Sequence, residues 1–292
     1  MILVTSAFGR VGHAVTSELV KRGFDVRATD INPRTEELLT EGVAEVRVGD
    51  ARDRAFVLEC MQGVDQVAYV PPVMLYDEDE IAIQAIDCAL EAGVKQFVQL
   101  SVCHPGLSGL LQHTKKLIAE EHLKLLGFQR DWNFTILQPL HYTTNVPVKQ
   151  IVETGIYENF KPLDRKLGYV DLRDVAEATA IVLSEGEKHK FASYELCGPS
   201  YLSIREIAEL LEKLSGRKIQ TIWWDREHLF DGAFHNFCNS ANDSYSRRAV
   251  LGIRDVYNTY GFAANKNILE WLLGRPARTM EDYIRDALKA MQ

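Results

Sequence analysis

The residues Ile2-Leu-Val-Thr5 lead directly into Ser6-Ala-Phe-Gly9-Arg-Val-Gly12, and a helical stretch, Val11–Arg22, begins within that run. An apolar strand, a glycine-containing turn and the start of a helix are the context in which backbone amides bind a dinucleotide. Gly9 would let the backbone approach a pyrophosphate, and Gly12 would let the helix pack closely against the strand. The first amides of the helix, at the positive end of its dipole, would then hold the anion.

Outward from this loop, short β-branched runs alternate with helical stretches through the first half of the chain. The predicted strands are Ile2–Thr5, Asp25–Thr29, Val43–Val48, Gln66–Val70, Gln96–Ser101 and Phe134–Gln138. The helices between them include Arg54–Met61 and Glu78–Ala92, and the glycines that close helices before the next strand are Gly23, Gly63 and Gly93. Fully apolar strands separated by helices indicate a parallel sheet covered on both faces. We therefore predict an α/β fold with a Rossmann-type doubly wound parallel sheet.

The second half of the chain has a different pattern, which predicts a smaller α+β lobe. Ser203-Ile-Arg-Glu206 is a capping box that opens an amphipathic helix, and Thr279-Met-Glu-Asp282 opens the last helix in a similar way. Residues 225–262 are rich in Asn, Ser, Tyr and Phe with weak periodicity, which favours loops and short helices. We expect a dinucleotide-binding domain over residues 1–150 and a C-terminal substrate lobe over residues 151–292, with some segments returning to the sheet.

Composition and charge exclude several classes of protein. The 292 residues are 46% hydrophobic and carry a formal net charge of −8, and so acidic a chain is a poor general binder of nucleic acid. No apolar run approaches the roughly 18 residues that span a bilayer, and the N-terminus lacks the pattern of a signal peptide. We therefore expect a cytoplasmic protein without a membrane partner. No spacing predicts a disulfide framework or a metal site among the five cysteines, which are Cys60, Cys88, Cys103, Cys197 and Cys238.

Two aspartates support a nicotinamide cofactor. Asp30 ends the second predicted strand, 18 residues after Gly12, where a carboxylate accepts hydrogen bonds from the adenosine ribose. A phosphate on that ribose would be repelled, so Asp30 favours NAD(H) over NADP(H), although the flanking Arg27 and Arg34 could reverse the preference. Asp50, at the end of the third strand, is placed to meet the adenine amino group. The alternatives are a glycine turn that has lost its ligand and an aspartate that is only solvated.

An ordered set of motifs over nearly the whole chain, with only residues 225–262 unmatched, resembles the NmrA-like family, an atypical branch of the short-chain dehydrogenase/reductases. The motifs are Ile2–Gly12, Val48-Gly-Asp50, Gly63-Val-Asp65, Val70-Pro-Pro72, Ala92-Gly-Val-Lys95, Leu100-Ser101, His113-Thr-Lys-Lys116 with Glu120, Gln138-Pro139, Asn145, Val170-Asp-Leu-Arg-Asp-Val-Ala176, Glu195-Leu-Cys-Gly-Pro199 and Gly274-Arg-Pro276. The resemblance implies a Rossmann-type domain, a smaller lobe and a substrate cleft between them. It also implies either an NAD(P)H-dependent reductase of quinones, dyes or secondary metabolites, or a nucleotide-binding regulator.

The chain departs from the family pattern at two positions. Many NADP-binding relatives have an arginine just after the second strand, where this chain has Ile31. The pair Tyr-x-x-x-Lys of short-chain reductases is replaced by Gln112 and Lys116, so the tyrosine acid is absent.

The expected catalytic residues are those that could position the nicotinamide or donate a proton. Lys116 could bond the nicotinamide ribose, and His113, on the same helical face, could donate a proton near neutral pH. His141 and Tyr142 follow the sixth strand, where parallel sheets place ligands. A solvated lysine, a surface histidine and ordinary loop packing are the alternatives. The expected cofactor-binding residues are Thr5, Ser6, Phe8, Gly9, Arg10, Val11, Gly12, Asp30, Asp50, Ala51, Val70, Pro71, Ser101, Lys116, Pro139 and Asn145.

Three functions follow, in order of preference. The first is an NAD(P)H-dependent reductase of a small aromatic, quinone or enone metabolite, with hydride transfer in the interdomain cleft. The second is an NAD(P)-binding redox-sensing regulator without turnover, and the third is a non-redox isomerase or lyase on the same scaffold. An α/β hydrolase is disfavoured because the chain has no G-x-S-x-G elbow. The expected partner is a small-molecule substrate, and a homodimer is compatible with this interpretation.

Overall fold

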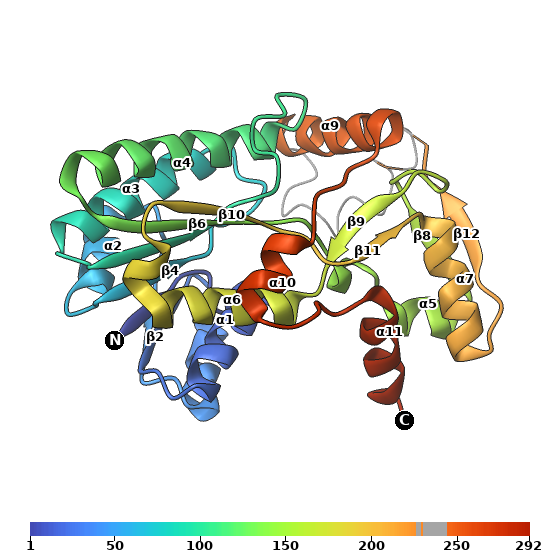
Figure 1. Ribbon diagram of the computed structural model, residues 1–292, viewed down its shortest axis with the longest axis horizontal. Coiled ribbons are helices and arrows are strands. Elements are labelled where there is room, and N and C mark those ends of the chain that lie inside the picture. The colour runs from blue at the N-terminus through green and yellow to red at the C-terminus, as the bar shows by residue number, and fades with distance from the viewer. Residues whose placement is uncertain (226–228, 230–243) are drawn as a thin grey trace.

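A computed structural model describes residues 1–225, 229 and 244–292 of the chain. Its centre is a seven-stranded sheet in the order β10-β6-β5-β4-β1-β2-β3, in which every neighbouring pair is parallel (Figure 1). The strands are β1 (Ile2–Val4), β2 (Val26–Asp30), β3 (Glu45–Val48), β4 (Gln66–Tyr69), β5 (Gln96–Leu100), β6 (Asn133–Pro139) and β10 (Ala192–Leu196). This arrangement confirms the predicted Rossmann-type sheet.

Helices cover both faces of the sheet, so the sheet separates two hydrophobic cores. On one face lie α1 (Arg10–Lys21) and α6 (Leu172–Glu185), and on the other lie α2 (Arg54–Met61), α3 (Glu78–Glu91) and α4 (Leu111–Arg130) (Figure 1). Because side chains alternate along a strand, Ile2 and Val4 of β1 belong to one core, whereas Leu3 belongs to the other. The strand order reverses between β1 and β4, and such a switch point is where doubly wound sheets bind their ligands.

The C-terminal half contributes two small sheets and the helices around them, at the right of Figure 1. One sheet has the order β11-β9-β7 and the other pairs β12 with β8. The strands are β7 (His141–Tyr142), β8 (Ile156–Asn159), β9 (Leu167–Val170), β11 (Ser200–Leu202) and β12 (Gln220–Trp223). The helices are α5 (Val148–Thr154), α7 (Ile204–Ser215), α9 (Ser244–Tyr260), α10 (Asn267–Leu273) and α11 (Met280–Lys289), and the 3-10 turns of the chain are η1 (Pro33–Glu41), η2 (Thr143–Asn145) and η3 (Gly186–His189).

Several local predictions are confirmed in this half, and one is wrong. Both capping boxes form, with Ser203 and Thr279 as the N-caps of α7 and α11. The expectation of loops and short helices over residues 225–262 fails where the structure describes the stretch, because α9 is a single helix of 17 residues. Its buried side chains, among them Val250 and Tyr257, pack into the main core, so tertiary contacts outweigh weak helical propensity. Residues 226–228 and 230–243, including Cys238, lie outside the described part.

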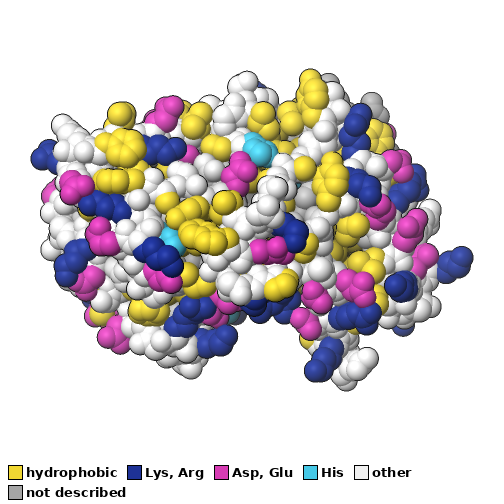
Figure 2. Space-filling view, in the orientation of Figure 1, with side chains coloured by type: hydrophobic (Ala, Val, Ile, Leu, Met, Phe, Trp, Pro, Cys, Tyr) yellow, Lys and Arg dark blue, Asp and Glu magenta, His cyan; other side chains and the backbone are white. Residues whose placement is uncertain are grey.

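The surface matches the acidic but mixed composition. On the face shown in Figure 2, Lys and Arg are interspersed with Asp and Glu, and hydrophobic side chains form scattered groups. Among the described residues, no helix is both long enough and apolar enough to cross a membrane.

Candidate active site

The glycine loop has the backbone geometry that the sequence predicts. Ser6, at the usual first-glycine position, adopts a positive φ of 48°. A Cβ atom on Gly12 would lie 2.1 Å from the Ser6 carbonyl oxygen and 2.8 Å from the Ala7 Cα. Only glycine therefore lets α1 begin this close to β1. The hydroxyls of Thr5 and Ser6 donate to the Val70 carbonyl oxygen at 2.8 and 2.9 Å, which holds the loop against the end of β4.

The first turn of α1 is suited to an anion. Its N-cap, Gly9, has an extended backbone and supplies no capping side chain, and no acidic residue occupies the first turn. The leading amides of a helix have no partners within the helix itself, and here no carboxylate competes for them. Together with the close approach of α1 to β1 that Gly12 permits, this arrangement fits the diphosphate of a dinucleotide.

Asp30 holds the same loop from the neighbouring strand. One of its carboxylate oxygens accepts a hydrogen bond from the Phe8 amide at 3.0 Å, and the other accepts one from the Asn32 amide at 3.0 Å. The Arg34 guanidinium lies over the Phe8 ring, 5.2 Å from its centroid. A carboxylate oxygen has a second lone pair, so Asp30 keeps acceptor capacity for a ribose hydroxyl.

Asp50 and Ala51, both expected to bind the cofactor, do not line the cleft. Asp50 accepts a hydrogen bond from the Arg52 amide at 2.9 Å, and the Ala51 carbonyl oxygen accepts one from the Gln84 amide group at 2.8 Å. Both residues follow β3, two strands from the switch point. The contact of Asp50 with the adenine stays a prediction.

A cleft of about 240 Å³ opens at the carboxyl ends of the central strands, with mainly apolar walls. Ten of the residues expected in the site line it, namely Val11, Val70, Pro71, Ser101, His113, Lys116, Pro139, His141, Tyr142 and Asn145. The others belong to the glycine loop and to the ends of β2 and β3. The predicted site is thus brought together as one cleft continuous with Val11 in the first turn of α1.

Lys116 reaches this cleft from α4, and its ammonium group forms an ion pair with Glu78 at the start of α3. The Glu78 side chain is only 1% exposed, and burial raises the pKa of its carboxyl group. Its second oxygen has no hydrogen-bond partner in the described chain. Lys115 makes the parallel ion pair with Asp79 at 2.8 Å. The sequence analysis missed Glu78, although consecutive carboxylates at a helix start followed by consecutive lysines on the next helix were a usable signal.

The structure corrects the premise on which His113 was selected. Burial lowers the pKa of His113 to about 3, and the nearby Lys116 charge adds to that effect. Its Nδ1 lies 3.4 Å from the His104 carbonyl oxygen. His113 is therefore neutral near pH 7, and an acid with a near-neutral pKa is not available at this position.

His141 and Tyr142 border the cleft from β7. Burial lowers the pKa of His141, so this imidazole is also neutral, and its Nε2 is buried without a partner in the described residues. The ring packs against Tyr257, with the centroids 5.0 Å apart. Burial raises the pKa of the Tyr142 phenol, which keeps its proton in place. Tyr142 therefore keeps a hydroxyl that can donate a hydrogen bond into the cleft, although the raised pKa makes it a weaker acid than a free phenol.

Three of the expected cofactor ligands, Ser101, Arg10 and Asn145, form hydrogen bonds within the protein. The Ser101 hydroxyl donates to the buried Glu120 carboxylate at 2.5 Å, which also accepts from Gln138 at 2.8 Å. The Arg10 guanidinium donates to Asn145 Oδ1 at 2.9 Å, which joins the start of α1 to η2. The Ser101 hydroxyl is therefore not free to donate to a cofactor, and the residue contributes only to the shape of the cleft. Arg10 and Asn145 together form the edge of the cleft.

The C-terminal half supplies walls that the sequence analysis did not identify. Phe160 and Lys161, which follow β8, line the cleft beside Ile253, Tyr257 and Phe262. The first of these residues, Phe160, is 148 positions after Gly12 at the end of the glycine loop, and nothing local in the sequence links them to the loop. Trp223, at the end of β12, does not line the cleft, and its ring centroid lies 4.7 Å from the Arg254 guanidinium carbon.

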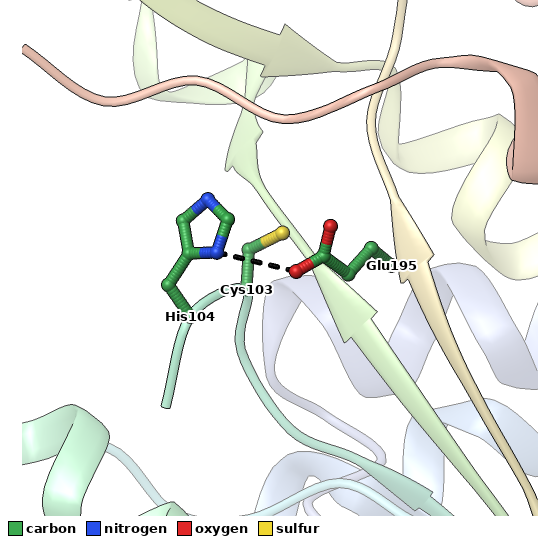
Figure 3. A group of neighbouring side chains, drawn as sticks. All are labelled: Cys103, His104 and Glu195. Atoms are coloured by element: carbon green, nitrogen blue, oxygen red, sulfur yellow. Dashed lines mark ion pairs between the residues drawn. The ribbon is translucent and has the colours of Figure 1, made fainter. Parts of the chain in front are cut away.

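A cysteine, a histidine and a glutamate meet just beyond β5. His104 Nδ1 lies 3.2 Å from a Glu195 carboxylate oxygen, and the Cys103 thiol points toward the same carboxylate (Figure 3). His104 Nε2 lies 2.6 Å from the Ala263 carbonyl oxygen. Burial raises the pKa of the Cys103 thiol, which disfavours the thiolate that metals bind. The group acts as an ion pair that ties the sheet to the segment beside Phe262.

The parallel sheet, the anion-binding loop and the cleft at the switch point define a Rossmann-type protein of the dinucleotide-binding class. The model of the NmrA-like family matches residues 1–264, and the chain belongs to that family.

Characterised relatives cover nearly the full chain at modest identity. Quinone oxidoreductase 2 of Escherichia coli is 28% identical over 97% of this chain and 97% of its own length. An NAD(P)H azoreductase of Xenophilus azovorans is 26% identical over 98% of this chain and 97% of its own.

Solved structures share the fold. The E. coli NADPH-dependent quinone oxidoreductase in complex with NADPH superposes with a TM-score of 0.79 at 24% identity, covering 99% of this chain and 100% of the other. The negative transcriptional regulator NmrA in complex with NAD superposes with a TM-score of 0.78 at 16% identity, covering 99% and 96%.

Proposed function

We propose that this protein is an NAD(P)H-dependent reductase of a small aromatic, quinone or enone metabolite. The observation that carries the proposal is the continuity of the site. A single cleft extends from the first turn of α1 to Lys116 and on to an aromatic wall. An anion-binding loop at one end and a predominantly apolar chamber at the other suit a nucleotide and a planar substrate. The full-length similarity to a quinone oxidoreductase and an azoreductase supports the same chemistry.

The residues of the chain have separate roles in this proposal. The bound nicotinamide supplies a hydride. Lys116, held by Glu78, orients the nicotinamide ribose and contributes positive charge beside the substrate. The Tyr142 hydroxyl, which stays protonated, donates a hydrogen bond to the substrate oxygen or nitrogen on which negative charge develops during reduction. The apolar walls exclude water from the reacting atoms.

Replacing Lys116 with methionine is expected to lower kcat/KM for quinone reduction by about 100-fold, because a positioned cation no longer stabilises developing negative charge. The measurement is oxidation of NADH and NADPH with a panel of quinones. Lys115→Met is the matched control, because Lys115 pairs with Asp79 and does not line the cleft. A double variant with Glu78→Gln removes the buried carboxylate that Lys116→Met would leave unpaired. Unchanged turnover in both variants would contradict the role of Lys116.

A nucleotide-sensing regulator without turnover is the second candidate. The lowered pKa values of His113 and His141 favour it, since neither imidazole is an acid near pH 7. Tight binding of one nucleotide, without oxidation of either by any quinone, would support the regulator over the reductase.

We propose that Asp30 favours NAD(H). The single variant Ile31→Arg is expected to raise the affinity for NADPH relative to NADH by about tenfold. The new arginine would form one charge-assisted hydrogen bond to the ribose phosphate. Ile31 is 62% exposed, so the substitution leaves the bonds from Asp30 to Phe8 and Asn32 intact. Asp30→Arg should shift the ratio further. Fluorescence titration with both nucleotides measures it, and a wild-type preference for NADPH would overturn the assignment.

A further inference from the structure

Lys161 is a buried cation in the wall of the cleft. It follows β8, is 7% exposed, and is fixed through its backbone amide, which donates to Asn159 Oδ1 at 3.0 Å. Its ammonium group has no hydrogen bond or ion pair with any residue of the described chain. Buried charges are normally paired, because an unpaired one loses its hydration without compensation. The position of Lys161 therefore needs an explanation beyond packing.

The charges around the cleft leave this cation uncompensated. Among the residues that the structure describes, two lysines line the cleft and no aspartate or glutamate does. Lys116 has an ion-pair partner in Glu78, which lies outside the lining, whereas the charged neighbour of Lys161 in the described chain is Arg10, a like charge. This excess of positive charge occurs in a chain with a net charge of −8. A cationic, low-dielectric cleft in an acidic protein attracts anionic ligands.

A second polar group at the same place also lacks a partner. The Nε2 atom of His141 is buried and has no hydrogen bond in the described structure. Lys161 and His141 line the same cleft, and the charge of Lys161 lowers the pKa of His141 further. A neutral imidazole can donate one hydrogen bond, and a lysine can donate three. Together they offer donors to one anionic group of a ligand.

We propose that Lys161 and His141 form a subsite for an anionic group on the substrate, so that the preferred substrate is an aromatic or quinone compound bearing a carboxylate or sulfonate. The aromatic walls at Phe160, Tyr257 and Phe262 would hold the ring next to this subsite. This inference names the substrate class of the proposed reductase, and it therefore rests on that proposed function. Anion binding itself can be tested without turnover.

The binding test uses calorimetry of the full chain, with saturating nucleotide, against naphthalenesulfonate and its uncharged counterpart naphthalenesulfonamide. The wild type is expected to prefer the sulfonate, and Lys161→Met to lose about 10- to 100-fold of sulfonate affinity while keeping that for the sulfonamide. Lys161→Arg should retain the preference. Lys149→Met is the matched control, since Lys149 lies in the same half of the chain with its side chain 74% exposed. Lys161→Met should fold, because removing an unpaired buried charge is not destabilising.

Three results would overturn the proposal. An equal loss of affinity for the sulfonate and the sulfonamide in Lys161→Met would mean that Lys161 contributes to the shape of the cleft but does not bind the anionic group. A higher dissociation constant for NADH or NADPH, with sulfonate binding unchanged, would assign Lys161 to the cofactor phosphates. No binding of the sulfonate by the wild type would remove the subsite altogether.

A kinetic comparison separates this inference from the reductase proposal. With naphthoquinone and naphthoquinone sulfonate as substrates, Lys161→Met should raise KM for the sulfonate alone. If neither quinone is reduced while naphthalenesulfonate still binds through Lys161, the reductase proposal fails and the anion subsite stands.

The pH dependence provides an independent readout. Burial lowers the pKa of Lys161 to about 7, with a smaller contribution from Arg10. Of the other titratable groups at the cleft, His113 and His141 have lowered pKa values because of burial, and Tyr142 and Tyr257 have raised ones. Lys116 is held in its ion pair with Glu78. Because an anion binds the protonated amine, sulfonate affinity should be constant below pH 7 and fall by up to about tenfold per pH unit above it. Sulfonamide affinity should not change over that range.

Discussion

Replacing Gly12 with alanine is expected to weaken nucleotide binding by about 10- to 100-fold, which is the affinity equivalent of the 1–3 kcal/mol typical of overpacking. The added Cβ would lie 2.1 Å from the Ser6 carbonyl oxygen and 2.7 Å from its carbonyl carbon. Both are backbone atoms that cannot rotate away, so α1 or the loop must shift. The shift separates the leading amides of α1 from the position of the diphosphate.

The measurement is fluorescence titration with NADH and NADPH. Gly106→Ala is the control, since a Cβ there meets nothing within 4 Å and the backbone is not left-handed. Circular dichroism distinguishes a local change in the loop from loss of the fold. An alanine variant that folds and binds either nucleotide as tightly as the wild type would show that this turn does not hold the diphosphate.

Replacing Asp174 with alanine is expected to lower the free energy of unfolding by about 3–5 kcal/mol, the usual cost of removing one partner from a buried ionic network. The Asp174 side chain is fully buried in α6. It accepts hydrogen bonds from the Arg275 guanidinium at 2.8 Å and from the Arg278 amide at 2.6 Å, and it also pairs with the Arg278 guanidinium. Without the carboxylate, two arginines lose their shared acceptor and the segment before α11 loses its attachment.

Urea denaturation followed by circular dichroism measures this change. Asp164→Ala is the matched control, because its ion pair with Arg205 lies on a carboxylate that is 75% exposed. An exposed pair contributes at most about 1 kcal/mol. If the free energy of unfolding falls by a similar amount in both variants, the contact between α6 and the C-terminal segment is not a major source of stability.

Much of the fold was predictable because its signals are local. The predicted strand over Gln66–Val70 differs by one residue from β4, and the capping boxes at Ser203 and Thr279 both form. Strands, caps and glycine turns depend on neighbouring residues, whose types are visible in the chain. The helix α9 was not predictable in this way, because its stability comes from packing against distant core residues.

Contacts between distant segments, including those that build the site, were predictable only in part, for the same reason. The motifs Val170–Ala176 and Gly274–Pro276 were noted separately, and the structure shows that they meet through Asp174 and Arg275. The near-neutral pKa expected for His113 was wrong because its burial depends on the whole cleft. The sequence analysis missed Glu78 and Lys161 because their surroundings come from distant segments. Glu78 pairs with Lys116, and Lys161 lies in a cleft that is lined mostly by other elements.

The order of apolar and glycine residues by itself determined the parallel sheet, the turn at Ser6 and the start of α1, since each follows from backbone conformation and burial over a few neighbouring residues. Only the tertiary structure decided which charges are paired and which are left facing the cleft. Desolvation and Coulomb interactions depend on distances between segments far apart in the chain. For that reason Lys116 is paired with Glu78, whereas Lys161 is buried beside Arg10.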